Sequence, residues 1–493
     1  MRLKGILEPY AAIQSLPPEL LVIIFTLAHR QSYDVINNSW HENADLRSPS
    51  TFPYALASVC KLWQDVMSTV PEFWTRITVF IDSNSFSFSN LPLHIEWSRD
   101  LLFQIIVTRR LCSDVMDIGE KARVRQVMDT LGPHLHRCFL LHFDVKYSSS
   151  LPSIYADIFH DRVCPDLRSI VFKSRVGDGP GNYFRDDLRN DTLREENPLP
   201  ALRSLVLDGF NYVDLCEHHP DWFLSMPEDG LEELSVSHFT QSQRSVKHKY
   251  SFYDGWNYLK DVAHLKLSSL DFSCESKDIN MDDLVFSKLH VLILEDLSWQ
   301  LVREILLCCE YINGVSVTRC AIGEISDVAL SAFTLILDSI PASSNFSQFL
   351  AQWSGFDLTI RDCPGLDDSV FEKWSTKYSD APDTLYCPLL GNLTIHNCPN
   401  FSVERLKHLV EVRLEQCNRS GGLEFGDPPL SYLKVTGHGP FLSDEDRKWF
   451  LNNVESFDGW ETHQTCFTNM TDSSTVSGFT LVLYFTYNDR DMS

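Results

Sequence analysis

A histidine and a cysteine lie two residues apart in LTIHNCPN, residues 393–400. Imidazole and thiolate groups are metal ligands, and a thiol beside a histidine is also the basis of nucleophilic catalysis. A second segment, HLHRCFLLH, brings His134, His136 and His142 close enough in sequence to form a metal cluster. A third, GDGPG at 177–181, is rich in glycine, as phosphate-binding loops are. Each of these chemistries depends on the element that would position the residues.

The segment around Cys398 is one copy of a repeated pattern. Leu390, Leu393, Ile395 and Cys398 have the spacing L-x-x-L-x-I-x-x-C. Other copies place leucine or phenylalanine in the last position, so that position is selected for apolarity and size. The copies, some of them incomplete, lie in HLHRCFLLHF (134–143), DLRSIVF (166–172), ALRSLVLDGF (201–210), GLEELSVSHF (230–239), DVAHLKLSSL (261–270), KLHVLILEDL (288–297), YINGVSVTRC (311–320), GFDLTIRDC (355–363), LLGNLTIHNC (389–398), HLVEVRLEQC (408–417) and PLSYLKV (429–435).

The cysteines at the last position of the repeat are therefore predicted to be core residues. Free cysteine behaves as a small buried hydrophobe, whereas a reactive thiol needs an electropositive, partly exposed setting. We expect Cys320, Cys363, Cys398 and Cys417, four of the fourteen cysteines, to be buried and reduced. Each should follow a strand by the same offset.

The other chemical motifs have plainer interpretations. Leu135, Cys138 and Leu140 of the histidine-rich segment occupy repeat positions, and GDGPG lacks the lysine and the strand-to-helix setting of a phosphate loop. Adjacent Cys308 and Cys309 fall on an apolar helix between repeats. We therefore expect no catalytic site, no metal and no cofactor, and we predict that the chain is not an enzyme. An enzyme hidden in divergent repeats is the alternative.

The repeated pattern resembles the leucine-rich repeat, whose short strands line the inside of a horseshoe. Alternate strand residues point to opposite sides, so Leu393 is predicted to enter the core while Asn392 and Thr394 face outward. The resemblance implies an α/β solenoid whose stacked repeats share one core. Long intervals between copies imply inserted helices, and DVALSAFTLILDSI, within 321–353, is predicted to be one.

Composition and charge exclude several classes of protein. The chain has 493 residues, of which 44% are hydrophobic, enough for a large core and more than one domain. Its longest apolar run, LLVIIFTLA, is too short to cross a membrane, which takes about 20 residues. The net charge of −25 argues against binding to nucleic acid. With no secretory signal and no C-x-x-C pair, the protein is expected in the cytoplasm or the nucleus with reduced cysteines.

The first eighty residues contain a helix that is apolar on every side. In SLPPELLVIIFTLA, residues 15–28, Ser15 can cap a helix whose entrance suits the prolines that follow. Residues 20–25 are all apolar, so the helix should be buried all round. An amphipathic second helix is predicted for 54–70. Such short helices make too small a core to cover both elements, so some of this surface should contact the first repeats or another protein.

These N-terminal motifs resemble the F-box domain over residues 14–76. The resemblance is carried by Leu16, Pro17, Glu19, Leu20, Leu21, Ile24, Phe25, Val59, Cys60, Trp63 and Trp74. In that family an exposed apolar face docks on the Skp adaptor of a cullin-based ubiquitin ligase, and a leucine-rich-repeat solenoid commonly follows. The insert 29–53 is longer than the family's usual connection, and we predict that it is a loop.

The whole chain resembles the F-box/leucine-rich-repeat proteins, particularly the divergent fungal type. This resemblance implies a substrate-recognition subunit of an SCF-type E3 ubiquitin ligase. A scaffold with a non-proteolytic role, either bound to the adaptor or standing alone, is the alternative. The partners would be the Skp adaptor, a cullin bound through it, and an unidentified target. The residues expected at the adaptor are Leu16, Pro17, Leu20, Leu21, Ile24, Phe25, Val59 and Trp63.

The predicted layout has four parts. They are the F-box-like helical domain (14–76), a polar linker (77–90), an irregular solenoid (91–440) and a C-terminal cap (441–493). The cap is expected to contain a helix at 442–454 and an edge strand at 475–487.

The outward strand residues of the last repeats are the predicted target-binding surface. Arg413 and Lys434 are expected to share a row with Thr359 and Thr394, which would give a small basic spot on an acidic protein. Such a spot could bind an acidic or phosphorylated segment. The residues assigned to the target are Arg361, His396, Arg413, Tyr432 and Lys434.

Overall fold

The computed structural model divides the chain into two compact units. The smaller unit comprises Met1–Val115 and Thr465–Ser493, and the larger unit is Met116–Gln464. The residues that the structure describes are 16–37, 52–82, 86–110, 117–159, 163–178, 199–218, 231–240, 251–255, 259, 261–274, 285–323, 330–351, 353–377, 385–419 and 429–459. The expected cap at Ser15, the strand at 475–487, most of GDGPG and part of the insert lie outside these residues.

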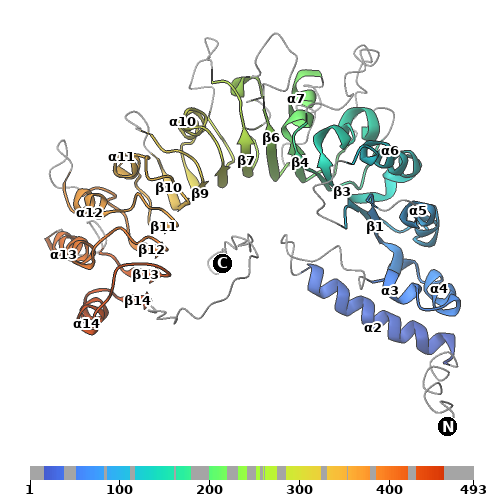
Figure 1. Cartoon of the computed structure of the whole chain (residues 1–493), viewed down its shortest axis with the longest axis horizontal. Coiled ribbons are helices and arrows are strands. Elements are labelled where there is room, and N and C mark those ends of the chain that lie inside the picture. The colour runs from blue at the N-terminus through green and yellow to red at the C-terminus, as the bar shows by residue number, and fades with distance from the viewer. Residues whose placement is uncertain are drawn as a thin grey trace, which may run out of the picture. The chain divides into compact units, whose positions relative to one another are not determined.

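Parallel strands in sequential order form the sheet of the larger unit. From β3 to β14, each strand pairs with the next one along the chain (Figure 1). The strands are β3 (Cys138–Tyr147), β4 (Ser169–Val176), β5 (Ser204–Asp208), β6 (Glu233–Phe239), β7 (His264–Leu270), β8 (Val291–Glu295), β9 (Ile312–Thr318), β10 (Ala332–Asp338), β11 (Asp357–Arg361), β12 (Asn392–His396), β13 (Tyr432–Thr436) and β14 (Ser456–Gly459).

Alternation along these strands separates a core face from an outward face. Leu358 and Ile360 of β11 pair in register with Leu393 and Ile395 of β12, and all four side chains are buried. Because the apolar positions stack from strand to strand, each repeat completes its core against its neighbours. The predicted α/β solenoid, similar to a leucine-rich-repeat array, is confirmed.

A left-handed turn ends many of the strands. In six places the residue directly after a strand has a positive φ. These residues are Asp296, Arg319, Ser339, Asp362, Asn397 and Gly437. The amides of the first five donate to a carbonyl of the next strand, as Asp362 N does to the His396 carbonyl (2.9 Å). The next side chain then enters the core, and Cys320, Cys363 and Cys398 are each fully buried two residues after a strand. The prediction for these three cysteines is confirmed.

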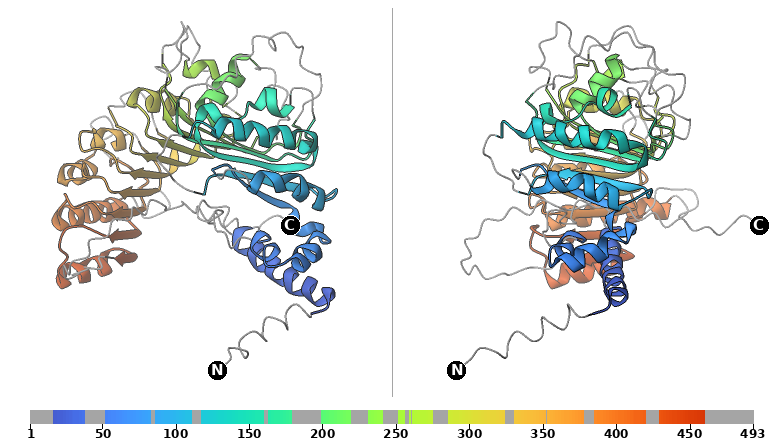
Figure 2. Two further views of the ribbon diagram at one scale, coloured as in Figure 1. Left: turned by 45° about the vertical axis from the view of Figure 1, so that its right-hand side comes forward. Right: turned by 90° about the vertical axis from the view of Figure 1, so that its right-hand side faces the viewer.

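Helices pack against the other face of the sheet in the larger unit, and Figures 1 and 2 show them as a second layer. They are α6 (Glu120–Leu131), α7 (Gly209–His218), α10 (Trp299–Leu307), α11 (Phe346–Ala351), α12 (Asp368–Trp374), α13 (Val403–Arg419) and α14 (Asp444–Asn453), with short η turns at Gly132–Arg137, Ser148–Ser150, Ile154–Phe159 and Phe252–Gly255. The helix predicted for 442–454 is confirmed by α14. Ser443 caps it, because its side chain accepts a hydrogen bond from Asp446 N.

Two elements of the larger unit differ from the prediction. The segment expected to be a helix within 321–353 contains β10, whose Leu335 and Leu337 continue the buried stack. A short apolar run fits both periodicities, and here the neighbouring strands decide. The segment 408–417, expected to be a strand, belongs to α13. Cys417 is therefore buried as predicted, but it lies on a helix instead of following a strand.

The first copy of the repeat is correct in type but shifted in register. On β3 the core positions are Leu141 and Phe143, which pair with Ile170 and Phe172 of β4. Leu140 faces outward and is half-buried.

The smaller unit holds a short helical core and a two-stranded parallel pair. Its elements are α2 (Pro18–Asn37), α3 (Tyr54–Ala57), α4 (Lys61–Ser68), the turn η1 (Pro71–Trp74), β1 (Arg76–Phe80), α5 (Phe86–Trp97) and β2 (Phe103–Thr108). The core cluster is formed by Leu21, Phe25, Phe52, Val66, Met67, Phe73 and Trp74.

Three sequence predictions for this unit need correction. The helix α2 continues to Asn37, so the first part of the insert 29–53 is helical and not a loop. The segment 54–70, predicted to be a single helix, forms two helices, α3 and α4. The helical conformation is interrupted between Ala57 and Lys61. The polar linker 77–90 includes most of β1 and the start of α5, so it is largely regular secondary structure.

Candidate functional site

The helix α2 has a buried face and an exposed face, and both are apolar. Leu21 and Phe25 point into the core and are 1% and 0% exposed. Leu20, Ile23, Ile24 and Leu27 are 46%, 56%, 47% and 57% exposed. Their spacing of three, four and seven residues places them on one side of the helix. We call these four side chains the α2 face.

The buried side of α2 is fixed by aromatic packing. The Phe25 ring meets Trp63 of α4 edge-to-face, with 5.0 Å between ring centroids. Trp74 is 1% exposed, and its indole Nε1 donates to the Met67 carbonyl (3.0 Å). These contacts pack the core side of α2 against the rest of the unit, and the α2 face therefore points away from this core.

The structure divides the residues predicted to contact the adaptor. Leu20, Ile24, Val59 and Pro17 are exposed, whereas Leu21 and Phe25 belong to the core. Leu16 and Trp63 are partly buried against the same core. The core of this unit therefore covers only one side of α2, and the other side remains uncovered among the described residues.

Among the exposed apolar residues of this unit that sequence reasoning missed are Ile23, Leu27 and Leu62. A helical projection anchored on Leu21 and Phe25 would have placed Ile23 and Leu27 on the opposite side. Leu62 and Val59, at 38% and 59% exposed, lie near the start of α4.

The outward face of the larger unit's sheet carries polar residues in rows. One row, in register, is Thr359, Thr394, Lys434 and Asp458, and another is Asp338, Arg361, His396 and Thr436. Asn392 pairs in register with Tyr432 in a third row. The predicted target residues Arg361, His396, Tyr432 and Lys434 therefore do lie together on this face.

The basic spot predicted on this face is not formed. Lys434 Nζ pairs with Asp458 of β14 (2.8 Å), and that bond raises the pKa of the lysine. His396 Nδ1 lies 2.9 Å from the Thr436 hydroxyl. The positive charge of Lys434 is thus matched by a carboxylate on the next strand.

Arg413 was wrongly placed on the target surface. It lies on α13, is 0% exposed, and donates to the carbonyls of Leu390, Tyr386 and Cys387. The two bonds to Tyr386 and Cys387 are each 2.9 Å. The guanidinium group therefore stabilises the loop before β12 and cannot reach a partner.

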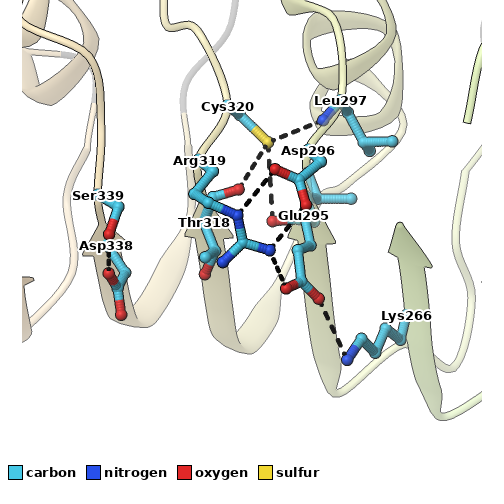
Figure 3. A network of polar contacts seen from close by, with 10 residues as sticks. Lys266, Glu295, Asp296, Leu297, Thr318, Arg319, Cys320, Asp338 and Ser339 are labelled. Atoms are coloured by element: carbon cyan, nitrogen blue, oxygen red, sulfur yellow. Dashed lines mark hydrogen bonds and ion pairs between the residues drawn. The ribbon is translucent and has the colours of Figure 1, made fainter. Parts of the chain in front are cut away.

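Charged side chains at the ends of β8 and β9 form a network with Lys266 of β7 (Figure 3). Arg319 pairs with Asp296 (2.7 Å) and with Glu295, and Glu295 also pairs with Lys266 (3.3 Å). Cys320 lies next to this network, and its Sγ accepts a hydrogen bond from Leu297 N (3.4 Å). Two acids and two bases neutralise one another here.

Burial disfavours the charged forms of Cys308, Cys398 and His142, the forms in which a thiol attacks or an imidazole donates a proton. It raises the pKa of Cys398 to about 11 and that of Cys308 to about 12, so both are thiols at neutral pH. Burial, with Lys173 nearby, lowers the pKa of His142 to about 4. Within the described ranges, no group of three or more His, Cys, Asp or Glu residues is placed to hold a metal ion.

The chain matches no model of a protein family, and no curated protein shows significant similarity to it in sequence. None of the helices in the described part of the chain is long and apolar enough to span a membrane. The candidate functional surfaces are thus the α2 face and the outward face of the sheet.

Proposed function

We propose that this protein is the substrate-recognition subunit of an SCF-type E3 ubiquitin ligase. The α2 face would dock on the Skp adaptor, and through it on a cullin, while the repeat unit would bind the target. The observation that carries the proposal is the α2 face itself: four large aliphatic side chains held outward by a helix whose other side is packed. Large exposed apolar patches mark interaction sites in soluble proteins.

The magnitude of burial supports a specific interface. Fully burying a leucine or isoleucine is worth roughly 1.5–3 kcal/mol, so four half-exposed side chains could contribute about 4 kcal/mol. Since 1.4 kcal/mol is about tenfold in affinity, this contribution corresponds to nearly a thousandfold. The α2 face could therefore decide whether a complex is detected.

Co-purification with the adaptor tests the proposal. Leu20→Ala with Ile24→Ala removes half of the α2 face without touching the core residues Leu21 and Phe25. We expect the double variant to lose the Skp adaptor while its repeat unit stays folded. A matched control is Leu389→Ala with Leu451→Ala, which truncates exposed leucines (49% and 57%) of the larger unit. Equal adaptor recovery by both double variants would refute the proposal.

The receptor role and a scaffold role differ in the fate of the target. A receptor shortens the lifetime of the proteins that it captures, and proteasome inhibition restores them. We expect the partners captured by the repeat unit to accumulate when the α2 face is truncated. Capture without any change in partner lifetime would favour the scaffold.

A further inference from the structure

A carboxyl group lies fully buried where β5 ends and α7 begins. Asp208 is the last residue of β5, and α7 starts at the next residue, Gly209. The Asp208 side chain is 0% exposed. Its Oδ1 accepts hydrogen bonds from the backbone amide of Asn211 (3.2 Å) and from the side-chain amide of Asn211 (2.7 Å). This oxygen therefore caps the first turn of α7.

The second oxygen of the carboxyl group, Oδ2, is buried and makes no hydrogen bond to any residue that the structure describes. Elements packed around this junction do carry charged or titratable side chains. They are Lys173 and Arg175 of β4, Glu233 and His238 of β6, Asp157 of η4, Tyr253 and Asp254 of η7, and Tyr212, Asp214, Cys216 and Glu217 of α7. In the described part of the chain, none of them forms an ion pair or a hydrogen bond with Asp208. An ionised Asp208 would therefore be buried without a countercharge, which is costly.

The proton on this carboxyl group is linked to the position of α7. Burial raises the pKa of Asp208 to about 7, although the hydrogen bonds from Asn211 act in the opposite direction. If α7 moves away and the carboxyl group reaches water, its pKa returns to about 4. The closed conformation thus binds the proton more tightly than the open one. Its stabilisation by the proton is complete below about pH 4 and is lost as the pH rises to about 7.

The first turn of α7 covers an aromatic cluster of the larger unit. The ring centroids of Phe210 and Phe239 are 5.2 Å apart, and those of Phe239 and Phe272 are 5.1 Å apart. All three rings are buried. The Tyr212 hydroxyl donates to the Gly255 carbonyl (3.0 Å) and joins the same turn to η7. Movement of this turn would expose the aromatic cluster.

We propose that Asp208 is a pH-sensitive switch, in which the protonated carboxyl group keeps the first turn of α7 closed on the aromatic cluster and ionisation releases it. The released turn exposes Phe210, Phe239 and Phe272, an apolar surface that the closed form hides. Because the switch lies within the larger unit and uses no residue of the α2 face, it does not rest on the proposed function.

Hydrogen exchange of the full-length chain tests the switch. Exchange of the amides of residues 209–218 would be followed at pH 6, 7 and 8 and corrected for the intrinsic effect of pH on exchange. With a pKa of about 7 in the closed form and about 4 in the open form, we expect the opening equilibrium of α7 to rise about tenfold from pH 6 to pH 8. Unchanged exchange of α7 over this range would overturn the proposal.

The helix α12 provides an internal reference. It is also capped by an aspartate, Asp367, which accepts from Ser369 N and Val370 N, but the Asp367 side chain is exposed. Protection of α12 should therefore stay constant between pH 6 and pH 8. An equal rise in the exchange of α7 and α12 would indicate general unfolding and would overturn a local switch.

Asp208→Asn assigns the effect to one residue. The asparagine keeps an oxygen that can accept from Asn211, but it cannot ionise. We expect the opening equilibrium of α7 in this variant to be the same at pH 6 and pH 8. The matched control, Asp367→Asn, should keep the tenfold rise of the parent.

A pH-dependent α7 in Asp208→Asn would show that another group is responsible, and it would contradict the switch. If this variant does not fold, the comparison of α7 with α12 in the parent still decides. Adaptor binding through the α2 face should be the same in both variants, so failure of the switch and failure of the proposed function are distinguishable.

Discussion

Replacement of Arg413 should unfold part of the repeat unit, although the residue looks like a surface charge in the sequence. Its guanidinium group is fully buried and donates three hydrogen bonds to carbonyls of Tyr386, Cys387 and Leu390. A buried polar group that loses its partner costs roughly 1–3 kcal/mol, and breaking a buried charged contact typically costs about 3–5 kcal/mol. We expect Arg413→Ala to lower the free energy of unfolding by about 3–5 kcal/mol. Arg413→Glu should be worse, because a carboxylate would face carbonyl oxygens.

Urea unfolding of the full chain gives the change in free energy, and hydrogen exchange locates it. The amides of residues 385–390 should exchange faster in Arg413→Ala than in the parent. The control is Arg419→Ala on the same helix, whose ion pair with Glu415 (3.0 Å) is exposed and should be worth less than about 1 kcal/mol. If Arg413→Ala and Arg419→Ala destabilise the protein equally, Arg413 does not support the loop.

Three further predictions concern the larger unit. Cys398, with its pKa raised to about 11 by burial, should resist alkylation until the protein unfolds, and Cys398→Ser should cost on the order of 1–3 kcal/mol; rapid labelling of the native protein would contradict this. Gly437→Ala should destabilise by at least about 1 kcal/mol in thermal or urea unfolding, because φ is +71° and the new Cβ would lie 1.9 Å from Asn397 Oδ1; an unchanged midpoint would show that the turn can relax. Burial raises the pKa of Asp208 from 3.8 to about 7, so its protonated form is favoured in the folded state and its contribution to stability falls as pH rises from about 4 to about 7. Asp208→Asn should remove that slope, worth on the order of 4 kcal/mol at most, and a parallel pH–stability curve for parent and variant would refute the assignment.

The repeat strands were predictable because their signal is local and recurs. Leu393, Ile395 and Cys398 combine the two-residue alternation of a strand with an apolar position after the turn, and most of the copies fold as strands. Stacking of identical offsets then determines the parallel order. The fold class and the burial of three cysteines follow from this repetition alone.

The misassigned element shows where such patterns fail. In HLVEVRLEQC the apolar residues satisfy the repeat, but Leu406, Leu409, Arg413 and Cys417 also recur at intervals of three and four. In the structure this segment is helical. The sheet continues directly from β12 to β13, so α13 is the connection between these two strands along the chain. An arginine at a buried helical position has no signature in the sequence, since its partners are backbone carbonyls of a separate loop.

The α2 face was only partly predictable from the sequence. The run of apolar residues at 20–25 indicates surplus hydrophobic surface, but which residues face outward depends on the packing of Phe25 against Trp63. Likewise, the ion pair between Lys434 and Asp458 depends on β14, and no copy of the repeat predicted a strand there. Pairings across strands require the register, which comes from the tertiary fold.

Titration of the purified Skp adaptor into the full-length chain tests the central claim most directly. The account predicts a saturable complex whose affinity falls by about thirtyfold in Leu20→Ala with Ile24→Ala, since two of the four anchors lose roughly 2 kcal/mol. Leu389→Ala with Leu451→Ala should bind like the parent. A parent chain that does not bind the adaptor, or an α2-face variant that binds it as tightly as the parent, would contradict the account.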